Sequence, residues 1–226
     1  MMTTAIEPVA TAAGVERAPV LDLEILLADA AVAHGHLCAG QVLGVRMAMF
    51  ACALLRVADP RGADRKRLVT FVEIDRCATD AIGVVTGCRL GKRALKFVDW
   101  GKMAATFVDL QRVCGEDVYA GVRVAALESS KDLARQRYPH MEKKNEAQML
   151  AYRELSDAEL FTAEWVEVSL PPREFPGFKG PRVACAVCGE GVSYGRELER
   201  DGEVLCRGCA EPEARYYRPL RCADAG

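Results

Sequence analysis

Two Cys-x-x-Cys pairs near the C-terminus constrain this chain more than any other feature of its sequence. The first pair is Cys185 and Cys188, and the second is Cys206 and Cys209, with seventeen residues between the pairs. Zinc in a structural role takes four thiolates in a closed tetrahedron, and this spacing is typical of such a site. So short a segment buries little apolar surface, so metal binding must supply most of its folding free energy. We therefore predict a small four-cysteine zinc finger over residues 183–215.

A stretch rich in proline and glycine separates these cysteines from the rest of the chain. Residues 171–182 contain four prolines and two glycines, a composition that breaks regular structure and suits a linker. The length of 226 residues allows one domain of ordinary size and one small unit. We therefore expect a core domain over residues 20–170, followed by the linker and the finger. Residues 1–19 and 216–226 are expected to be flexible tails.

The charge and hydropathy of the chain argue against several classes of partner. Thirty basic and thirty-two acidic residues leave a formal net charge of −2, so no overall positive field favours nucleic acid or an anionic membrane. The longest apolar stretch, residues 42–57, contains Arg46 and predicts a buried helix, not a membrane span. The N-terminus lacks the basic start of a secretory signal. Ten cysteines in such a chain favour metal or thiol chemistry in the cytoplasm.

The pattern of apolar residues predicts an α+β fold. Helices are predicted over residues 23–31, 43–54 and 130–152, with a shorter one over 79–85 that Thr79 caps. Ser156 begins a capping-box pattern, which predicts one more short helix. Five strands are expected, over residues 67–74, 95–99, 103–110, 118–127 and 163–170. The second and third of these strands are expected to form a hairpin around Trp100 and Gly101.

A second group of metal-ligating side chains lies in the first half of the chain. His34, His36 and Cys38 fall within five residues, and Cys77 follows the first predicted strand with Asp80 one helical turn further on. Histidine, cysteine and carboxylate are the ligands that zinc and its neighbours in the periodic table use. One histidine with the two cysteines would leave a fourth position open, as in a catalytic site. The alternative is that the cysteines are small buried side chains and the histidines cap a helix.

The remaining cysteines divide by their surroundings. Cys52 and Cys114 are expected in the core, and Cys222 is expected to be a free thiol in the C-terminal tail. Cys88 lies in a glycine-rich turn and is a candidate for binding a cofactor or relaying a thiol group, with Asp80.

The order of short motifs resembles one known family. From about residue 23 to residue 170 the chain is similar to the FmdE family, named for formylmethanofuran dehydrogenase. The motifs that carry the resemblance are His34-Gly35-His36-Leu37-Cys38-Ala39-Gly40, Leu43-Gly44-Val45-Arg46-Met47, Glu73 with Cys77 and Asp80-Ala81-Ile82, Gly87-Cys88 with Gly91-Lys92, and Asp99-Trp100-Gly101-Lys102.

The resemblance implies several properties of the chain. It implies a thioredoxin-like core with a mixed five-stranded sheet flanked by helices, a treble-clef finger and a homodimer. It also implies a core metal site, holding zinc or another transition metal, at Cys38 and Cys77. Either His34 or His36 would be the third ligand, and the other would orient a ligand or act as an acid or base.

Three functions are consistent with these residues. The first is a metal-binding accessory protein that handles a metal, sulfur or cofactor group for a molybdenum or tungsten enzyme as its client. The second is a free-standing zinc enzyme, with His36 or Asp80 as general base and Lys92 or Lys102 stabilising an anion. The third is sulfur transfer by Cys38, since a thiolate beside a protonated histidine is nucleophilic. A nucleic-acid regulator that uses the finger is disfavoured by the overall charge.

Overall fold

The computed structural model describes residues 21–218 of the chain. The predicted tail of residues 1–19, the last part of the predicted C-terminal tail and Cys222 lie outside the described residues. The chain divides into two compact units, one ending at Pro171 and one beginning at Pro172. The first is the core domain and the second is the finger unit, and each is described by itself.

A mixed five-stranded sheet organises the core domain, as the sequence predicts. The strand order is β2-β1-β3-β4-β5, with β1 parallel to β2 and every other neighbouring pair antiparallel. Phe107 and Val122 pair across β3 and β4 on one face of the sheet, and both are buried. The strands are β1 (Leu68–Val72), β2 (Leu95–Phe97), β3 (Ala104–Gly115), β4 (Val118–Ala126) and β5 (Phe161–Ser169).

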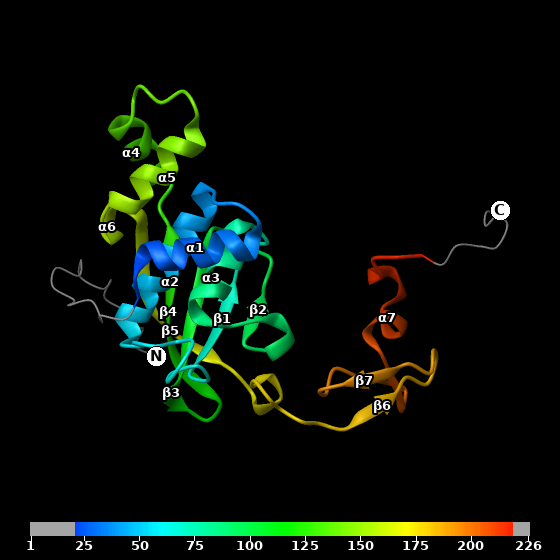
Figure 1. Cartoon of the computed structure of the whole chain (residues 1–226). Helices are drawn as coiled ribbons and strands as arrows, with labels where there is room; N and C mark the ends of the chain where they lie inside the picture. The colour runs from blue at the N-terminus through cyan, green and yellow to red at the C-terminus, as the bar shows by residue number, and fades with distance from the viewer. Residues whose placement is uncertain (1–20, 219–226) are drawn as a thin grey trace, which may run out of the picture. The chain divides into compact units, whose positions relative to one another are not determined.

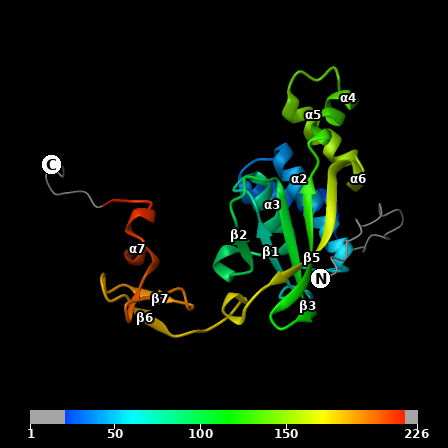
Figure 2. The ribbon, with the colours of Figure 1, turned by 180° about the vertical axis from the view of Figure 1, so that it is seen from behind.

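Helices pack against one face of this sheet (Figure 1). Figure 2 shows the sheet from behind, where the strands lie in front of α2 and α3. The longest helix, α2, buries twelve of its seventeen residues, because it lies between the sheet and the neighbouring helices. The helices of the core are α1 (Leu23–His34), α2 (Ala39–Leu55), α3 (Cys77–Thr86), α4 (Ser129–Arg137), α5 (Lys144–Glu154) and α6 (Asp157–Leu160), with the short helix η1 (Leu90–Lys92). Among the described residues, no helix combines the length and the apolar character needed to cross a membrane.

The predicted hairpin around Trp100 and Gly101 is wrong. Strand β2 pairs with β1 in parallel and lies on the side of β1 away from β3. The segment between β2 and β3 passes over the end of β1, because the backbone N–H groups of Trp100 and Lys102 both donate to the carbonyl oxygen of Glu73. A turn does occur at Trp100 and Gly101, as the sequence predicts. It carries the chain across the end of β1, so that β3 pairs with β1 and not with β2.

Two predicted helices have different bounds in the structure. The region predicted as one helix over residues 130–152 is two helices, α4 and α5. The chain leaves the helix before Pro139, because proline disfavours helical backbone at the residue that precedes it. Helix α3 begins at Cys77, so Thr79 lies inside it and donates its hydroxyl to the Ile74 carbonyl.

The capping box before α6 is confirmed, with the Glu159 carboxylate accepting from the backbone N–H of Ser156 at 2.8 Å.

Of the two cysteines predicted to lie in the core, Cys52 and Cys114, only Cys52 is buried. Cys52 is buried in the main apolar cluster beside the sheet, where desolvation raises the pKa of its thiol to about 12. Cys114 is exposed, so the prediction that it belongs to the core is wrong. The cause is the length of β3, since its last three residues extend beyond the covered face of the sheet and are exposed.

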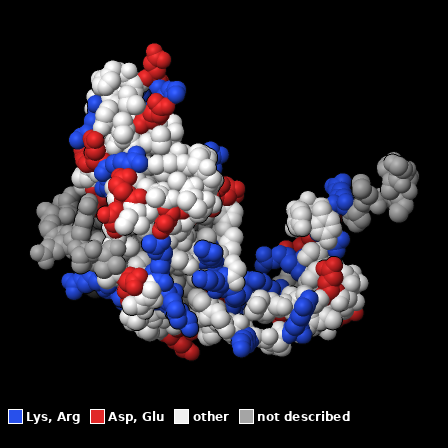
Figure 3. All heavy atoms as spheres, in the orientation of Figure 1, with Lys and Arg blue, Asp and Glu red and all other residues white. Residues whose placement is uncertain are grey.

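Charge is unevenly distributed over the core domain. In the view of Figure 3, Lys and Arg prevail over the lower part of the core, whereas both signs are mixed over its upper part. Basic residues gather in two segments, 56–67 and 89–93. The turn at Gly87, which precedes the second segment, lies beside the first, since a Cβ on Gly87 would lie 3.7 Å from the Arg61 side chain. The chain therefore has a local basic region at these two segments, although its formal net charge is −2.

Candidate metal centre

Three side chains from three helices meet at one end of the core domain. Ligand atoms of His34, Cys38 and Cys77 all lie within 4.8 Å of one another. His34 is the last residue of α1, Cys38 is the N-cap of α2, and Cys77 is the first residue of α3. All three are partly buried, so the group is reachable from solvent yet held by the surrounding helices.

The turn between α1 and α2 brings the first two of these residues together. Gly35 ends α1 with a φ of 94°, a left-handed conformation that glycine adopts without steric cost, and its N–H donates to the Ala31 carbonyl. The chain then reverses, and Cys38 is extended at the start of α2 with a φ of −142°. The local sequence thus places a histidine and a cysteine on either side of a tight turn.

Two glycines let α2 approach the start of α3. A Cβ at Gly40 would lie 3.1 Å from the Cys77 Cβ, and a Cβ at Gly44 would lie 2.5 Å from the carbonyl oxygen of Ala78. Any larger side chain at these positions would separate the two helices and the two cysteines they carry. Both cysteines stand at helix N-termini, Cys38 as the N-cap of α2 and Cys77 as the first residue of α3.

The structure distinguishes between the two histidines. His34 Nδ1 lies 2.7 Å from Asp80 Oδ2, which leaves Nε2 as the nitrogen able to bind a metal. A carboxylate on the far nitrogen is the usual way in which a metal-binding histidine is oriented. His36 is exposed and outside the three-residue group, and its ring lies 4.9 Å from that of His34. Asp80, proposed from sequence as a cofactor ligand or base, therefore contacts the histidine ligand.

The donor set of this group fits a transition metal. Two atoms bound to one zinc ion in a tetrahedron are about 3–4 Å apart, so small side-chain movements would suffice to bind one. Desolvation and the neighbouring Cys38 thiol raise the pKa of Cys77. Cys77 therefore keeps its proton at neutral pH unless a cation offsets that cost. His34, Cys38 and Cys77 would hold the ion, and the fourth position would be open.

Gln41 is a neighbour of this group that the sequence reasoning missed. Its side chain is fully buried, and its Nε2 donates to the Cys77 carbonyl oxygen at 2.8 Å. A polar residue in the first turn of a helix whose other polar side chain is Arg46 is the sequence signal that could have found it.

Two other predicted site residues lie outside the three-residue group. Cys88 is buried in the core, with its sulfur 3.5 Å from the Thr70 hydroxyl, and burial raises the pKa of its thiol. Lys102 is exposed, and its ammonium lies 5.5 Å from the centre of the Trp100 ring. The structure does not bring the Cys88 thiol to the ligand group, and it places the Lys102 backbone beside the turn that leads from β1 to α3.

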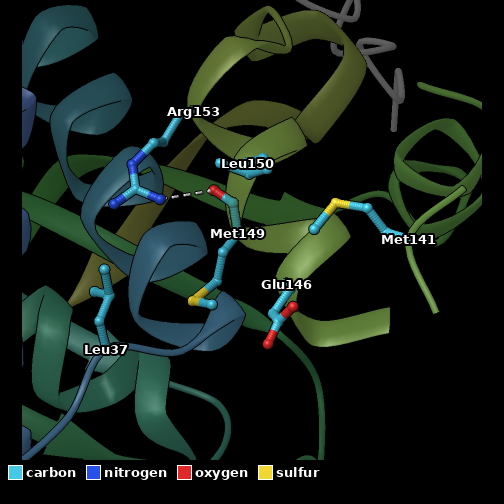
Figure 4. Close-up of a pocket in the computed structure, with 6 residues that line it drawn as sticks. All are labelled: Leu37, Met141, Glu146, Met149, Leu150 and Arg153. Carbon is cyan, nitrogen blue, oxygen red and sulfur yellow. Dashed lines mark hydrogen bonds between the residues drawn. The ribbon is translucent and has the colours of Figure 1, made fainter. Parts of the chain in front are cut away.

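An apolar groove borders the backbone of the loop that carries the candidate ligands (Figure 4). It has a volume of about 390 Å³ and lies between Leu37, which precedes Cys38, and helix α5. The N-terminal turn of α5 is joined to that of α2, since the Ala39 N–H donates to Asn145 Oδ1 at 3.1 Å. The residues that line the groove are Leu37, Met141, Glu146, Met149, Leu150 and Arg153.

The finger unit contains the second group of ligands. Ligand atoms of the four cysteines predicted from sequence lie within 4.8 Å of one another, with the sulfurs of Cys188 and Cys206 3.9 Å apart. Backbone N–H groups of Cys188 and Cys206 lower the pKa of Cys185 to about 6, so the first thiolate forms there. Arg215 Nη2 donates to the sulfur of Cys209 at 3.2 Å. The unit is built from β6 (Arg182–Ala184), β7 (Gly191–Ser193), β8 (Leu198–Arg200), β9 (Glu203–Leu205), α7 (Arg207–Ala210) and the short helices η2 (Pro172–Glu174) and η3 (Pro212–Ala214).

Comparisons with known proteins agree with this division. The sequence model of the FmdE family, described by the molybdenum formylmethanofuran dehydrogenase operon, matches residues 33–162. The model of the prokaryotic dksA/traR C4-type zinc finger matches residues 178–215. A curated protein of Archaeoglobus fulgidus, named as a probable S-adenosyl-L-methionine-binding protein, is 32% identical over 209 residues, covering 86% of this chain. The chain spans only 55% of that relative's length.

A solved structure supports the fold. The crystal structure of a tungsten formylmethanofuran dehydrogenase FmdE-like protein from Syntrophus aciditrophicus superposes with a TM-score of 0.53 at 20% sequence identity. The match covers 86% of this chain and 95% of that one. Since one family model covers more than half of the chain, and the C4-type zinc-finger model covers its C-terminal unit, the chain belongs to the FmdE family and carries a four-cysteine zinc finger at its C-terminus.

Proposed function

We propose that this protein is a metal-binding accessory protein that holds a transition metal, most simply zinc, at His34, Cys38 and Cys77. The observation that carries the proposal is the meeting of three ligand atoms within 4.8 Å from three separate helices. A structural zinc site uses four protein ligands, as the finger does, whereas three ligands leave a position for an exchangeable group. The core centre therefore suits the handling of a metal, sulfur or cofactor group.

The chain's own residues have distinct roles in this proposal. A bound metal would supply a Lewis acid at the open position. Asp80 holds Nδ1 of His34 and so fixes the ring, and the N-termini of α2 and α3 carry Cys38 and Cys77. His36 is exposed beside the His34 ring and is placed to carry a proton to or from an incoming group.

The partners in this proposal follow from the family. We propose a molybdenum or tungsten enzyme as the client, because the family is described by a molybdenum formylmethanofuran dehydrogenase operon. We also propose a homodimer and a reducing compartment such as the cytoplasm, which would keep the described cysteines as the free thiols that the structure shows. Light scattering of the purified protein tests the dimer, and a monomer at micromolar concentration would contradict it.

Metal analysis tests the core centre directly. The metal per chain would be measured by elemental analysis, without metal-affinity purification, for the wild type and for Cys38→Ser/Cys77→Ser. We expect two metals per wild-type chain and one per double-variant chain, because the finger keeps its ion. Cys114→Ser is the matched control, since it removes an exposed thiol outside both groups and should leave two. One metal in all three proteins would refute the core centre.

The same proteins separate the two competing functions. A free-standing zinc enzyme would convert a small substrate in a reaction lost in Cys38→Ser/Cys77→Ser. A sulfur-transfer protein would carry a persulfide on Cys38, found by mass spectrometry, and would retain it without metal. The open position of the three-ligand group favours the enzyme as the second candidate.

S-adenosyl-L-methionine is a ligand to include in these assays. The name of the Archaeoglobus relative attributes binding of this molecule to that protein, of which this chain spans 55%. Equilibrium dialysis with labelled S-adenosyl-L-methionine, with and without metal, asks whether the shared part suffices. Stoichiometric binding that is unchanged in the double cysteine variant would place the ligand outside the core centre.

A further inference from the structure

Gln41 contacts the candidate metal centre through its amide nitrogen, and its amide oxygen is a buried acceptor without a partner among the described residues. Its side chain is fully buried, and Oε1 has no hydrogen-bond partner among the described residues. Leaving a buried carbonyl oxygen unpaired is costly, and folded proteins rarely do so. The unpaired atom therefore points to a hydrogen-bond donor that binds there.

The orientation of the Gln41 amide is fixed. Nε2 donates to the Cys77 carbonyl oxygen at 2.8 Å. Exchanging the amide nitrogen and oxygen would set two carbonyl oxygens against each other, so the flipped orientation is excluded. The oxygen and nitrogen of an amide are about 2 Å apart, so Oε1 lies within about 5 Å of the Cys77 backbone.

The position of Gln41 in the fold connects it to both cysteines. It stands in the first turn of α2, three residues after Cys38, and its hydrogen bond reaches the first residue of α3. Its neighbour Gly40 is so close to both cysteines that an added Cβ would lie 3.8 Å from the sulfur of Cys38 and 3.1 Å from the Cβ of Cys77. The amide itself contacts the backbone of one candidate ligand, through its hydrogen bond to the Cys77 carbonyl oxygen.

We propose that Gln41 is a positioning residue of the core centre, with two roles that rest on the proposed metal site. Its Nε2 holds the first turn of α3, and with it Cys77, against α2. Its Oε1 accepts a hydrogen bond from a group that enters with the metal, either water or a ligand bearing an O–H or N–H.

Cobalt binding tests the proposal, with Co²⁺ as the probe. Gln41→Met keeps the length of the side chain and removes both polar atoms. The finger is first filled with Zn²⁺, and Cys38→Ser/Cys77→Ser provides the reference spectrum without the core site. We expect Gln41→Met to lower the Co²⁺ affinity of the core site by about tenfold or more and to shift the visible cobalt bands. With the core site empty, its thermal midpoint should stay close to that of the wild type, because removing the unpaired oxygen offsets the loss of the hydrogen bond to Cys77.

Thr86→Val is the matched control. Thr86 is also buried, and its hydroxyl donates to the Ile82 carbonyl at the other end of α3. It should destabilise the metal-free and metal-bound forms alike, without changing the cobalt spectrum. If Gln41→Met does not fold, Gln41→Asn replaces it, since the shorter amide cannot reach Cys77 and should weaken Co²⁺ binding equally.

Three outcomes are distinguishable. No Co²⁺ at the core of the wild type would refute the metal centre itself. Tight Co²⁺ binding in the wild type, with the affinity of Gln41→Met within twofold and its spectrum unchanged, would overturn the role of Gln41 alone. Equal weakening of Co²⁺ binding by Gln41→Met and Thr86→Val would show a general effect on the fold, and it too would overturn the proposal.

Discussion

The close approach of α2 and α3 at Gly44 makes a quantitative prediction. A Cβ at this position would lie 2.5 Å from the Ala78 carbonyl oxygen and 2.7 Å from its Cα, whereas ordinary contact begins at 3.4 Å. Gly44→Ala therefore requires α3 to move by about 1 Å, because the atoms it meets are backbone atoms that cannot rotate away. Overpacking of this kind costs up to about 3 kcal/mol. The better helix propensity of alanine offsets about 1 kcal/mol of that cost, which leaves a net loss of about 2 kcal/mol.

This loss should be visible in both stability and metal binding. In a domain of this size, about 2 kcal/mol lowers the thermal midpoint by roughly 4–8 °C. The same movement displaces Cys77 from Cys38, so the core site should bind metal about tenfold more weakly, since metal ligands tolerate errors of only about 0.2 Å. Scanning calorimetry and a competitive chelator measure the two effects. Gly91→Ala is the control, because its Cβ would meet open space and should change stability by less than about 0.5 kcal/mol. If Gly44→Ala matches this control in both assays, the argument from helix contact is wrong.

Three further predictions concern buried charge and the finger. Arg123→Met should destabilise the core by about 3–5 kcal/mol in urea unfolding, because it leaves the carboxylate of Glu73 buried without its bidentate partner. Glu73 is only 3% exposed. A loss below about 1 kcal/mol would contradict this. Burial alone would raise the pKa of Asp109, but the charge of Arg67 and the hydrogen bonds from Arg67, Gln111 and Arg112 together outweigh burial, and the pKa is lowered. The stabilisation by Asp109 is therefore complete above its unfolded pKa of about 3.9 and is lost as the pH falls through its lower folded pKa. Asp109→Asn should therefore lower the free energy of unfolding more at about pH 7 than at about pH 2. A loss of stability that does not depend on pH would contradict this. A strong chelator should unfold the finger unit and leave the sheet intact by circular dichroism, and a finger that keeps its amide dispersion in NMR spectra would refute this.

Local sequence was sufficient where the structure depends on neighbours in the chain. The capping box at Ser156 and Glu159 forms as predicted, because both partners lie within one helical turn. Each Cys-x-x-Cys pair of the finger is a single turn, so the two cysteines within a pair are brought together locally. Predictions failed where distant partners decide, as at β2, which pairs with β1 across a crossover. The exposed end of β3 at Cys114 likewise depends on which part of the sheet the helices cover.

The sequence by itself determined the α+β class, the finger, the family resemblance and the candidate ligands of the core, because motifs and periodicity are local properties. Tertiary structure alone decided which histidine joins the ligand group. His34 and Asp80 are 46 residues apart, and only the packing of α1 against α3 sets a carboxylate on the His34 ring. It alone placed the Gln41 amide on Cys77, since no spacing rule links a residue of one helix to the backbone of another.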